Sequence, residues 1–185
     1  GQVCPKMDSC RVAVFAADNG VVDEGVSCAP RSVTLQQAIN MTRRRTGMSA
    51  MAAAFGDDVA VVDVGIATDV PDVGILDRKV RRGTGNIAVE DAMTRPEALA
   101  AMAAGMEQAA RAGADSITAL GIGEMGIGNT STSAAVLSAL TGADIEAVTG
   151  RGGGLTDEGF ARKKDVLRRA LTRRAVDKDD VLDVL

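Results

Sequence analysis

Short, continuous runs of apolar residues alternate along the chain with longer segments whose apolar residues recur at helical spacing. Continuous apolar runs are typical of strands whose two faces are both buried, as in a parallel sheet. The runs predict strands at residues 11–16, 59–66, 116–120 and 145–149. Helices are expected at residues 32–45, 48–55, 94–113 and 133–140, and from residue 156 onward. Because strands and helices alternate, the pattern predicts an α/β fold with a parallel sheet and helices on both faces.

The helix predicted at residues 94–113 has the clearest local signals. Thr94 can cap its amino terminus, Glu97 can complete a capping box, and Pro96 occupies the first turn, where a missing N–H group costs little. The preceding segment, residues 67–93, contains glycines and Pro71 and is expected to be irregular.

A glycine-rich segment from Gly121 to Ser133 follows the predicted third strand and leads into a helix. A strand, a glycine turn and a helix start, in this order, aim backbone N–H groups and the positive end of the helix dipole at one point. The segment therefore predicts an anion site, with phosphate as the expected ligand. Glu124 lies within the same turn and could face that ligand. Phosphate and carboxylate together indicate chemistry on a nucleotide.

Residues 150–154 form a second glycine-rich loop, which precedes the helix that carries Lys163. Backbone N–H groups plus one ammonium group suit a phosphate dianion. A plain connection followed by a surface lysine explains the same residues equally well. If the two preceding strands are neighbours in the sheet, the two loops could share one ligand.

The spacing of Gly121, Gly123 and Gly126 also satisfies the dinucleotide-binding pattern, with acidic residues about 20 positions further on. This interpretation would indicate an NAD-dependent oxidoreductase. That pattern normally occupies the first strand–helix turn of a domain, however, and at least two strands are predicted before it. A Walker-type phosphate loop is excluded because no lysine precedes Thr130. Glycines that only permit tight packing are a further explanation.

Composition narrows the choice of ligand and chemistry. Aromatic residues make up 2% of the chain, which leaves no stacking platform for single-stranded nucleic acid. The net charge of −4 argues against a polyanionic partner. Histidine is absent and the three cysteines form no paired motif, so an ordinary zinc site is excluded and carboxylates are the candidates for proton transfer. We therefore expect no nucleic-acid partner, no metal and no cofactor.

Several polar residues near the first loop allow two interpretations each. Asp18, Asp23 and Glu24 could ligate a metal, although solvated loop carboxylates are the simpler explanation. Gln36, early on the following helix, could read the edge of a heterocycle through its amide or lie on the helix surface. No run approaches ~20 consecutive apolar residues and no signal peptide opens the chain. We expect a cytoplasmic protein without a membrane-spanning segment.

Taken together, these segments resemble the nicotinate-nucleotide:dimethylbenzimidazole phosphoribosyltransferases, which make the lower-ligand nucleotide of cobalamin. The most specific motif is Gly-Glu-Met-Gly-Ile-Gly-Asn-Thr at residues 123–130. Supporting motifs are Phe-Ala-Ala-Asp-Asn-Gly-Val at 15–21, Glu-Gly-Val-Ser at 24–27, Val-Asp-Val-Gly-Ile at 62–66, and Gly-Arg-Gly at 150–152 with Lys163 downstream. The resemblance covers nearly the whole chain but only the middle of the family's length.

The resemblance implies a homodimer with a Rossmann-like parallel sheet, and a small helical domain of which this chain lacks a large part. It implies phosphoribosyl transfer from nicotinate mononucleotide to 5,6-dimethylbenzimidazole or a related base, giving alpha-ribazole phosphate and nicotinate. Glu124 would be the catalytic residue that remains, because the family's general-base glutamate lies near the carboxyl terminus, beyond this chain. The implied substrate-binding residues are Gln36 and Met125 at the benzimidazole, Gly152 and Lys163 near the phosphate, and Gly126, Asn129 and Thr130.

The chain begins with Gly instead of Met and ends at residues 179–185 within what reads as the start of a helix. We therefore expect residues 1–185 to form a single nucleotide-binding α/β domain that is truncated at both ends relative to the family. Two other interpretations stay open. The chain could be a noncatalytic or incomplete nucleotide-binding fragment of such an enzyme, or it could be an NAD-dependent oxidoreductase.

Overall fold

The computed structural model describes residues 7–185, and its centre is a parallel sheet. The sheet has four strands in the order β3-β2-β1-β4. They are β1 (Cys10–Ala17), β2 (Asp58–Gly65), β3 (Leu76–Asp77) and β4 (Ala119–Met125). β1 is central, with Val14 opposite Val61 of β2 on one side and Gly123 of β4 on the other.

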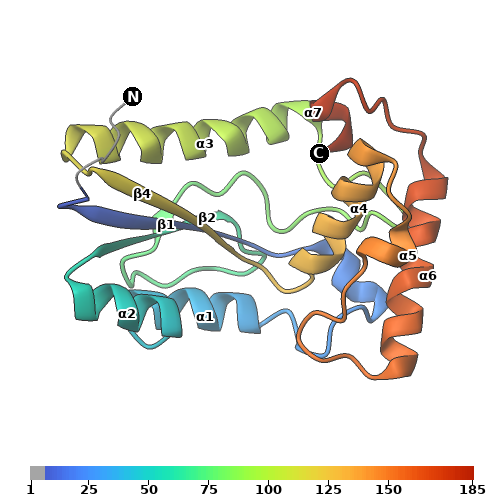
Figure 1. Ribbon diagram of the computed structural model, residues 1–185, viewed down its shortest axis with the longest axis horizontal. Helices are drawn as coiled ribbons and strands as arrows, with labels where there is room; N and C mark the ends of the chain where they lie inside the picture. Colours follow the sequence, from blue (N-terminus) through green and yellow to red (C-terminus); the bar gives the residue numbers. More distant parts are fainter. Residues whose placement is uncertain (1–6) are drawn as a thin grey trace.

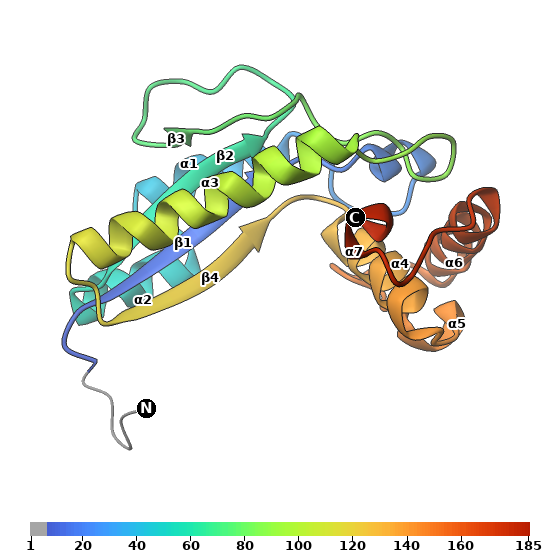
Figure 2. The same ribbon diagram turned by 90° about the horizontal axis from the view of Figure 1, so that it is seen from above.

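Helices cover both faces of this sheet (Figures 1 and 2). α1 (Val33–Thr42) and α2 (Gly47–Phe55) lie on one face, and α3 (Arg95–Ala114) lies on the other. The other helices gather beyond the carboxyl ends of the strands: η1 (Gly20–Glu24), α4 (Asn129–Thr141), α5 (Ile145–Val148), α6 (Asp157–Arg173) and α7 (Val181–Val184). The predicted α/β fold, with helices on both faces of a parallel sheet, is confirmed. None of the described helices combines the length and the apolarity needed to cross a membrane.

The core beneath α1 is built from small aliphatic side chains, as the scarcity of aromatic residues requires. Ala16, Val61 and Ile66 are at most 2% exposed and form one cluster. The capping box predicted for α3 is also present. Thr94 Oγ1 accepts the N–H of Glu97 at 3.4 Å, and Glu97 Oε2 accepts the N–H of Thr94 at 2.7 Å.

The prediction of a strand at residues 145–149 is wrong, because this segment contains the short helix α5. Asp144 caps that helix, since its Oδ1 accepts the N–H of Glu146 at 3.0 Å. Ile145 packs with buried residues of α4 and α6 and does not join the sheet. The second glycine-rich loop therefore follows a helix and not a neighbouring strand.

The predicted boundary of the third strand is also wrong. β4 continues through Gly121 and Gly123 as far as Met125, so the glycine-rich segment begins inside the sheet. α4 then begins at Asn129, four residues before the predicted start at Ser133. In addition, the two-residue strand β3 lies within the segment that was expected to be irregular.

Candidate functional site

The order of the strands defines where a ligand crevice should form. From β1 the chain moves outward to β2 and β3, and it then returns to place β4 on the other side of β1. In parallel sheets, ligands bind beyond the carboxyl ends of the strands at the point where the direction of winding reverses. That point lies here between the loop after β1 and the turn after β4.

These two loops touch each other directly. Nδ2 of Asn19 donates to the carbonyl oxygen of Ile127 at 3.0 Å. A Cβ atom on Gly126 would lie 2.3 Å from the carbonyl oxygen of Ala17, so only glycine permits this approach. Gly128 has a φ of +90°, a conformation that glycine adopts without strain. The turn at residues 126–128 therefore depends on its glycines.

The first glycines of the segment have a different role. Gly121 and Gly123 lie within β4, where a Cβ atom would be in ordinary contact, 3.4 Å, with the side chains of Val12 and Val14. The dinucleotide-binding pattern requires these glycines to form a strand–helix turn. Because they form part of a strand, the structure lacks the local geometry on which the oxidoreductase interpretation rests.

Glu124 and Asn129 lie at the two ends of the turn. The Glu124 side chain is exposed near the carboxyl end of β4, and one of its oxygens accepts a hydrogen bond from Nδ2 of Asn129. Asn129 is the first residue of α4, and the N-cap residue before it is glycine, so no side chain caps the helix. The amides of Asn129, Thr130 and Ser131 already donate within the turn. Because these N–H groups are already bonded, α4 would stabilise an anion mainly through its helix dipole.

The loop at residues 150–154 lies next to this turn, although no strand brings it there. The amides of residues 151–154 donate no intramolecular hydrogen bond within the described part of the chain. A Cβ atom on Gly152, whose φ is +62°, would lie 3.0 Å from Oγ1 of Thr130. The two loops lie together, although the condition stated for this, neighbouring strands before them, is not met.

Lys163 on α6 joins the two loops. Its Nζ donates to Oγ1 of Thr130 at 2.8 Å and to the carbonyl oxygen of Gly150 at 2.9 Å. The residue is only 1% exposed, and its ammonium group forms no ion pair among the residues that the structure describes. Burial lowers the pKa of Lys163. A buried cation with no carboxylate partner is costly, so this position favours an anionic ligand.

A cavity of about 230 Å³ opens at this junction. We call it the switch-point pocket, and its lining residues are 26–29, 125–130, 151–153, Leu155 and Lys163. Among the predicted site residues, the pocket brings together Met125, Gly126, Asn129, Thr130, Gly152 and Lys163. Glu124 is connected to it through Asn129.

Two residues differ from the sequence-based picture of the site. Gln36 lies on the exposed side of α1 and does not line the switch-point pocket. Cys28 does line it, and its Sγ donates to the carbonyl oxygen of Gly153 at 3.3 Å. Sequence reasoning missed Cys28, because a single cysteine outside any paired motif carries no signal of a site.

The three carboxylates of the first loop point to separate partners. Asp18 Oδ2 accepts the N–H of Ala67 at 2.8 Å, and Asp23 pairs with Arg31 at 2.8 Å. Glu24 binds side chains of the segment after β3 and of α6. Within residues 7–185, no group of three or more acidic or cysteine side chains is arranged to hold a metal ion.

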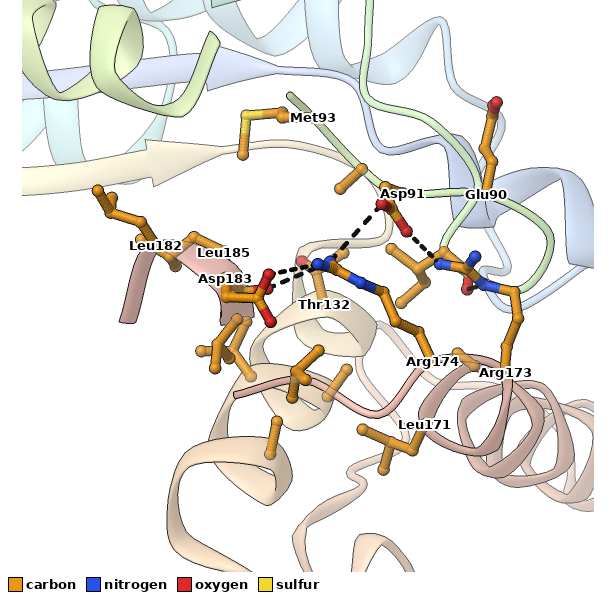
Figure 3. Close-up of a pocket in the computed structure, with 18 of the residues that line it drawn as sticks. Glu90, Asp91, Met93, Thr132, Leu171, Arg173, Arg174, Leu182, Asp183 and Leu185 are labelled. Atoms are coloured by element: carbon orange, nitrogen blue, oxygen red, sulfur yellow. Dashed lines mark hydrogen bonds and ion pairs between the residues drawn. The ribbon is translucent and has the colours of Figure 1, made fainter. Parts of the chain in front are cut away.

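A larger cavity, of about 720 Å³, lies among residues 87–95, α4, α6 and α7 (Figure 3). Its arginines on and after α6 are paired with carboxylates: Asp91 pairs with Arg173 at 2.6 Å and with Arg174 at 3.6 Å, and Arg174 also pairs with Asp183. None of the predicted site residues lines it. The smaller switch-point pocket, which holds an uncompensated cation, is the better candidate for an anionic substrate.

The fold and the pocket define an α/β protein of the class that binds ligands at the switch point of a parallel sheet. The family model described as phosphoribosyltransferase, DBI_PRT, matches residues 1–185. The chain belongs to this phosphoribosyltransferase family, which confirms the resemblance that the motifs indicated.

Named relatives and solved structures agree with this assignment. The chain is 43% identical over 185 residues to the nicotinate-nucleotide–dimethylbenzimidazole phosphoribosyltransferase of Acetivibrio thermocellus, covering 100% of this chain and 53% of that protein. It is 44% identical over 186 residues to the protein of the same name from Geobacter sp. strain M21, again covering 53% of it. The crystal structure of CobT from Thermus thermophilus matches with a TM-score of 0.87 and 47% identity, over 92% of this chain and 51% of that one. The chain thus spans about half the length of these relatives.

Proposed function

We propose that this protein transfers the phosphoribosyl group of nicotinate mononucleotide to 5,6-dimethylbenzimidazole or a related base, giving alpha-ribazole phosphate and nicotinate. The observation that carries the proposal is the buried, unpaired ammonium group of Lys163 in the switch-point pocket. The similarity to nicotinate-nucleotide–dimethylbenzimidazole phosphoribosyltransferases supports the choice of substrates.

The phosphate of the nucleotide would occupy the switch-point pocket. There it would meet Lys163, the free amides of residues 151–154 and the positive end of the α4 dipole. At about 230 Å³, the pocket is smaller than the 300–1,000 Å³ that is typical of sites enclosing a whole small molecule. We therefore assign it the phosphate end, with the ribose directed toward Met125 and Glu124.

The reaction is a displacement at the anomeric carbon of the ribose. A ring nitrogen of the acceptor base forms the new bond to this carbon, the bond to nicotinate breaks, and the configuration inverts. Positive charge builds up on the ribosyl group, so a nearby carboxylate stabilises the transition state. We assign this role to Glu124, whose orientation is fixed by Asn129.

The acceptor base also loses a proton, which a carboxylate can accept. Within residues 7–185, no carboxylate lines the switch-point pocket, so we assign proton removal to a carboxylate outside these residues, as the resemblance implies for a glutamate near the family's carboxyl terminus. Met125 and Gln36 are assigned to the acceptor base. Because Gln36 lies outside the pocket, its assignment requires the base to extend along α1. A homodimer in the cytoplasm completes the proposal.

Calorimetric titration tests the binding part of this proposal. Nicotinate mononucleotide should bind, nicotinate riboside should bind more weakly because it lacks the phosphate, and NAD should not compete. Equal affinity for nucleotide and riboside would contradict a phosphate site in the switch-point pocket. Chromatographic detection of alpha-ribazole phosphate, with and without an added carboxyl-terminal segment, tests turnover. In the complemented enzyme, Glu124→Gln should lower kcat more than it weakens nucleotide binding.

A second function, nucleotide binding without turnover, is favoured by one specific observation. The chain spans about half of its relatives, and no carboxylate of the described residues lines the switch-point pocket. Nucleotide binding without product, both alone and after complementation, would support this second function.

A further inference from the structure

The position of Lys163 is not set by the sheet, because α6 is not one of the helices that cover it. α6 lies beyond the carboxyl end of β4, beside α4 and α5 (Figure 2). Something other than strand pairing must therefore hold Lys163 at the correct distance from the turn at residues 126–130. α6 packs against α4 and α5, and its contacts with the segment after β1 add to this support.

One stripe of α6 faces η1 and the residues that follow it. Arg162, Val166 and Arg169 are spaced by four and three residues, which places them on one side of a helix. Arg162 packs closely over Gly25: a Cβ atom added to Gly25 would lie only 3.0 Å from Nη1 of Arg162. Val166 is 1% exposed and packs in one cluster with Val21. The last member of the stripe, Arg169, reaches the final residue of η1.

That residue is Glu24, and it joins three segments. Its Oε2 accepts a hydrogen bond from Nη2 of Arg169 on α6 at 2.9 Å. Its Oε1 accepts one from Nδ2 of Asn86, in the segment after β3, at 2.8 Å. The bonds from Asn86 and Arg169 lower the pKa of Glu24, so the side chain is charged at neutral pH. η1 itself begins directly after the loop in which Asn19 contacts the turn after β4.

We propose that Glu24 is a positioning residue, which holds α6 against η1 and thereby sets where the Lys163 ammonium group lies relative to the turn at residues 126–130. Its loss shifts Lys163 and selectively weakens contact with the phosphate of a mononucleotide. This inference rests on the proposed function, because it concerns how the same pocket is assembled.

Glu24→Gln tests the proposal, since it keeps the size of the side chain and removes its charge. The affinity for nicotinate mononucleotide should fall about tenfold, which corresponds to ~1.4 kcal/mol, while the affinity for nicotinate riboside should change less than about twofold. Glu107→Gln is the matched control, because Glu107 also pairs with an arginine, Arg78, but lies on α3, away from α6 and the switch-point pocket. It should leave both affinities unchanged.

A double-mutant comparison separates positioning from general destabilisation. In a Lys163→Met background, Glu24→Gln should cause no further loss of nucleotide affinity, because its effect acts through Lys163. Equal weakening of nucleotide and riboside by Glu24→Gln, or additive losses in the double variant, would overturn the proposal. If Glu24→Gln does not fold, Arg169→Gln removes the other partner of the same contact and should show the same selective loss.

The outcomes also separate this inference from the proposed function. If Lys163→Met weakens nucleotide binding and neither Glu24→Gln nor Arg169→Gln does, only the positioning role is wrong. If the unsubstituted chain binds nucleotide and riboside equally well, the phosphate site and the positioning role are both wrong.

Discussion

Lys163→Met should affect ligand binding and stability differently, because the buried, unpaired ammonium group of Lys163 destabilises the folded protein when no ligand is bound. The side chain is 1% exposed, its ammonium group has no carboxylate partner among the described residues, and burial lowers its pKa. Methionine has a similar length and needs no solvation. The partners left behind, Thr130 and Gly150, are both exposed and can bond to water instead. We expect the free energy of unfolding of the free variant to stay within ~1 kcal/mol of the original or to increase.

The affinity of the same variant for nicotinate mononucleotide should fall. Losing one charge-assisted contact to phosphate costs ~1–3 kcal/mol, or about 5- to 150-fold in Kd. Thermal unfolding with and without nicotinate mononucleotide measures both effects. At a concentration of 100 times the original Kd, the ligand should stabilise the original chain by ~2.7 kcal/mol, and a variant with a tenfold higher Kd by only ~1.4 kcal/mol. Lys178→Met, at an exposed position, controls for the change in net charge.

The pH dependence gives an independent check of the same reasoning. The pKa of Lys163 is lower in the folded protein than in the unfolded chain, so the unfolded chain holds the proton more tightly. The original chain should therefore gain stability, relative to the Met variant, as the pH rises through the lowered pKa toward about 10.4. A variant that binds nucleotide normally, or one destabilised by more than ~3 kcal/mol, would refute this account of Lys163.

Two further predictions concern the turn at residues 126–128 and the helix α3. Gly126→Ala should destabilise by ~1–3 kcal/mol, because its Cβ atom would lie 2.3 Å from a backbone oxygen of β1. Gly113→Ala, in α3 with nothing within 4 Å of the added atom, should be neutral or stabilising by ~0.5–1 kcal/mol; similar denaturant midpoints for the two variants would contradict this. Hydrogen bonds from Arg78 lower the pKa of Glu107 to about 2, so Glu107→Gln should be less stable than the original at pH 7. This difference should shrink as the pH falls from about 4.5 to about 2, which an acid titration of unfolding at matched ionic strength can test; a constant difference would argue against the ion pair.

Local signals in the sequence were sufficient where one segment determines its own structure. The β-branched run at residues 59–66 and the capping box of Thr94 and Glu97 both form as predicted. The strand predicted at residues 145–149 was wrong because a short apolar run fits a strand and a buried helix equally well. Asp144 is a local helix-cap signal that the strand prediction overlooked, whereas the packing against α4 and α6 is tertiary and leaves no local pattern.

The site shows the same division between local and tertiary information. The turn at residues 126–128 could be found from its glycines, because only glycine fits the close approach of β1 and β4. The burial of Lys163 could not be found from periodicity, since lysine is rarely buried. The glycine-rich loop before its helix and the resemblance to the family pointed to the residue but not to its burial. Cys28 gave no signal, because its place in the switch-point pocket depends on where the loop at residues 150–154 comes to lie.

The pocket therefore has two supports of different kinds, and this has a physical consequence. The turn after β4 is fixed to the sheet through the ladder with β1 and the contact at Asn19. The lysine and the second loop are fixed to α6, which is held by side-chain packing against α4 and α5, by packing at Val166 and by the contact of Arg169 with Glu24. Side-chain contacts shift more easily than a strand ladder does. An anion bound between the two supports adds an attraction that neither has alone, so ligand binding should order α6 more than it orders the sheet.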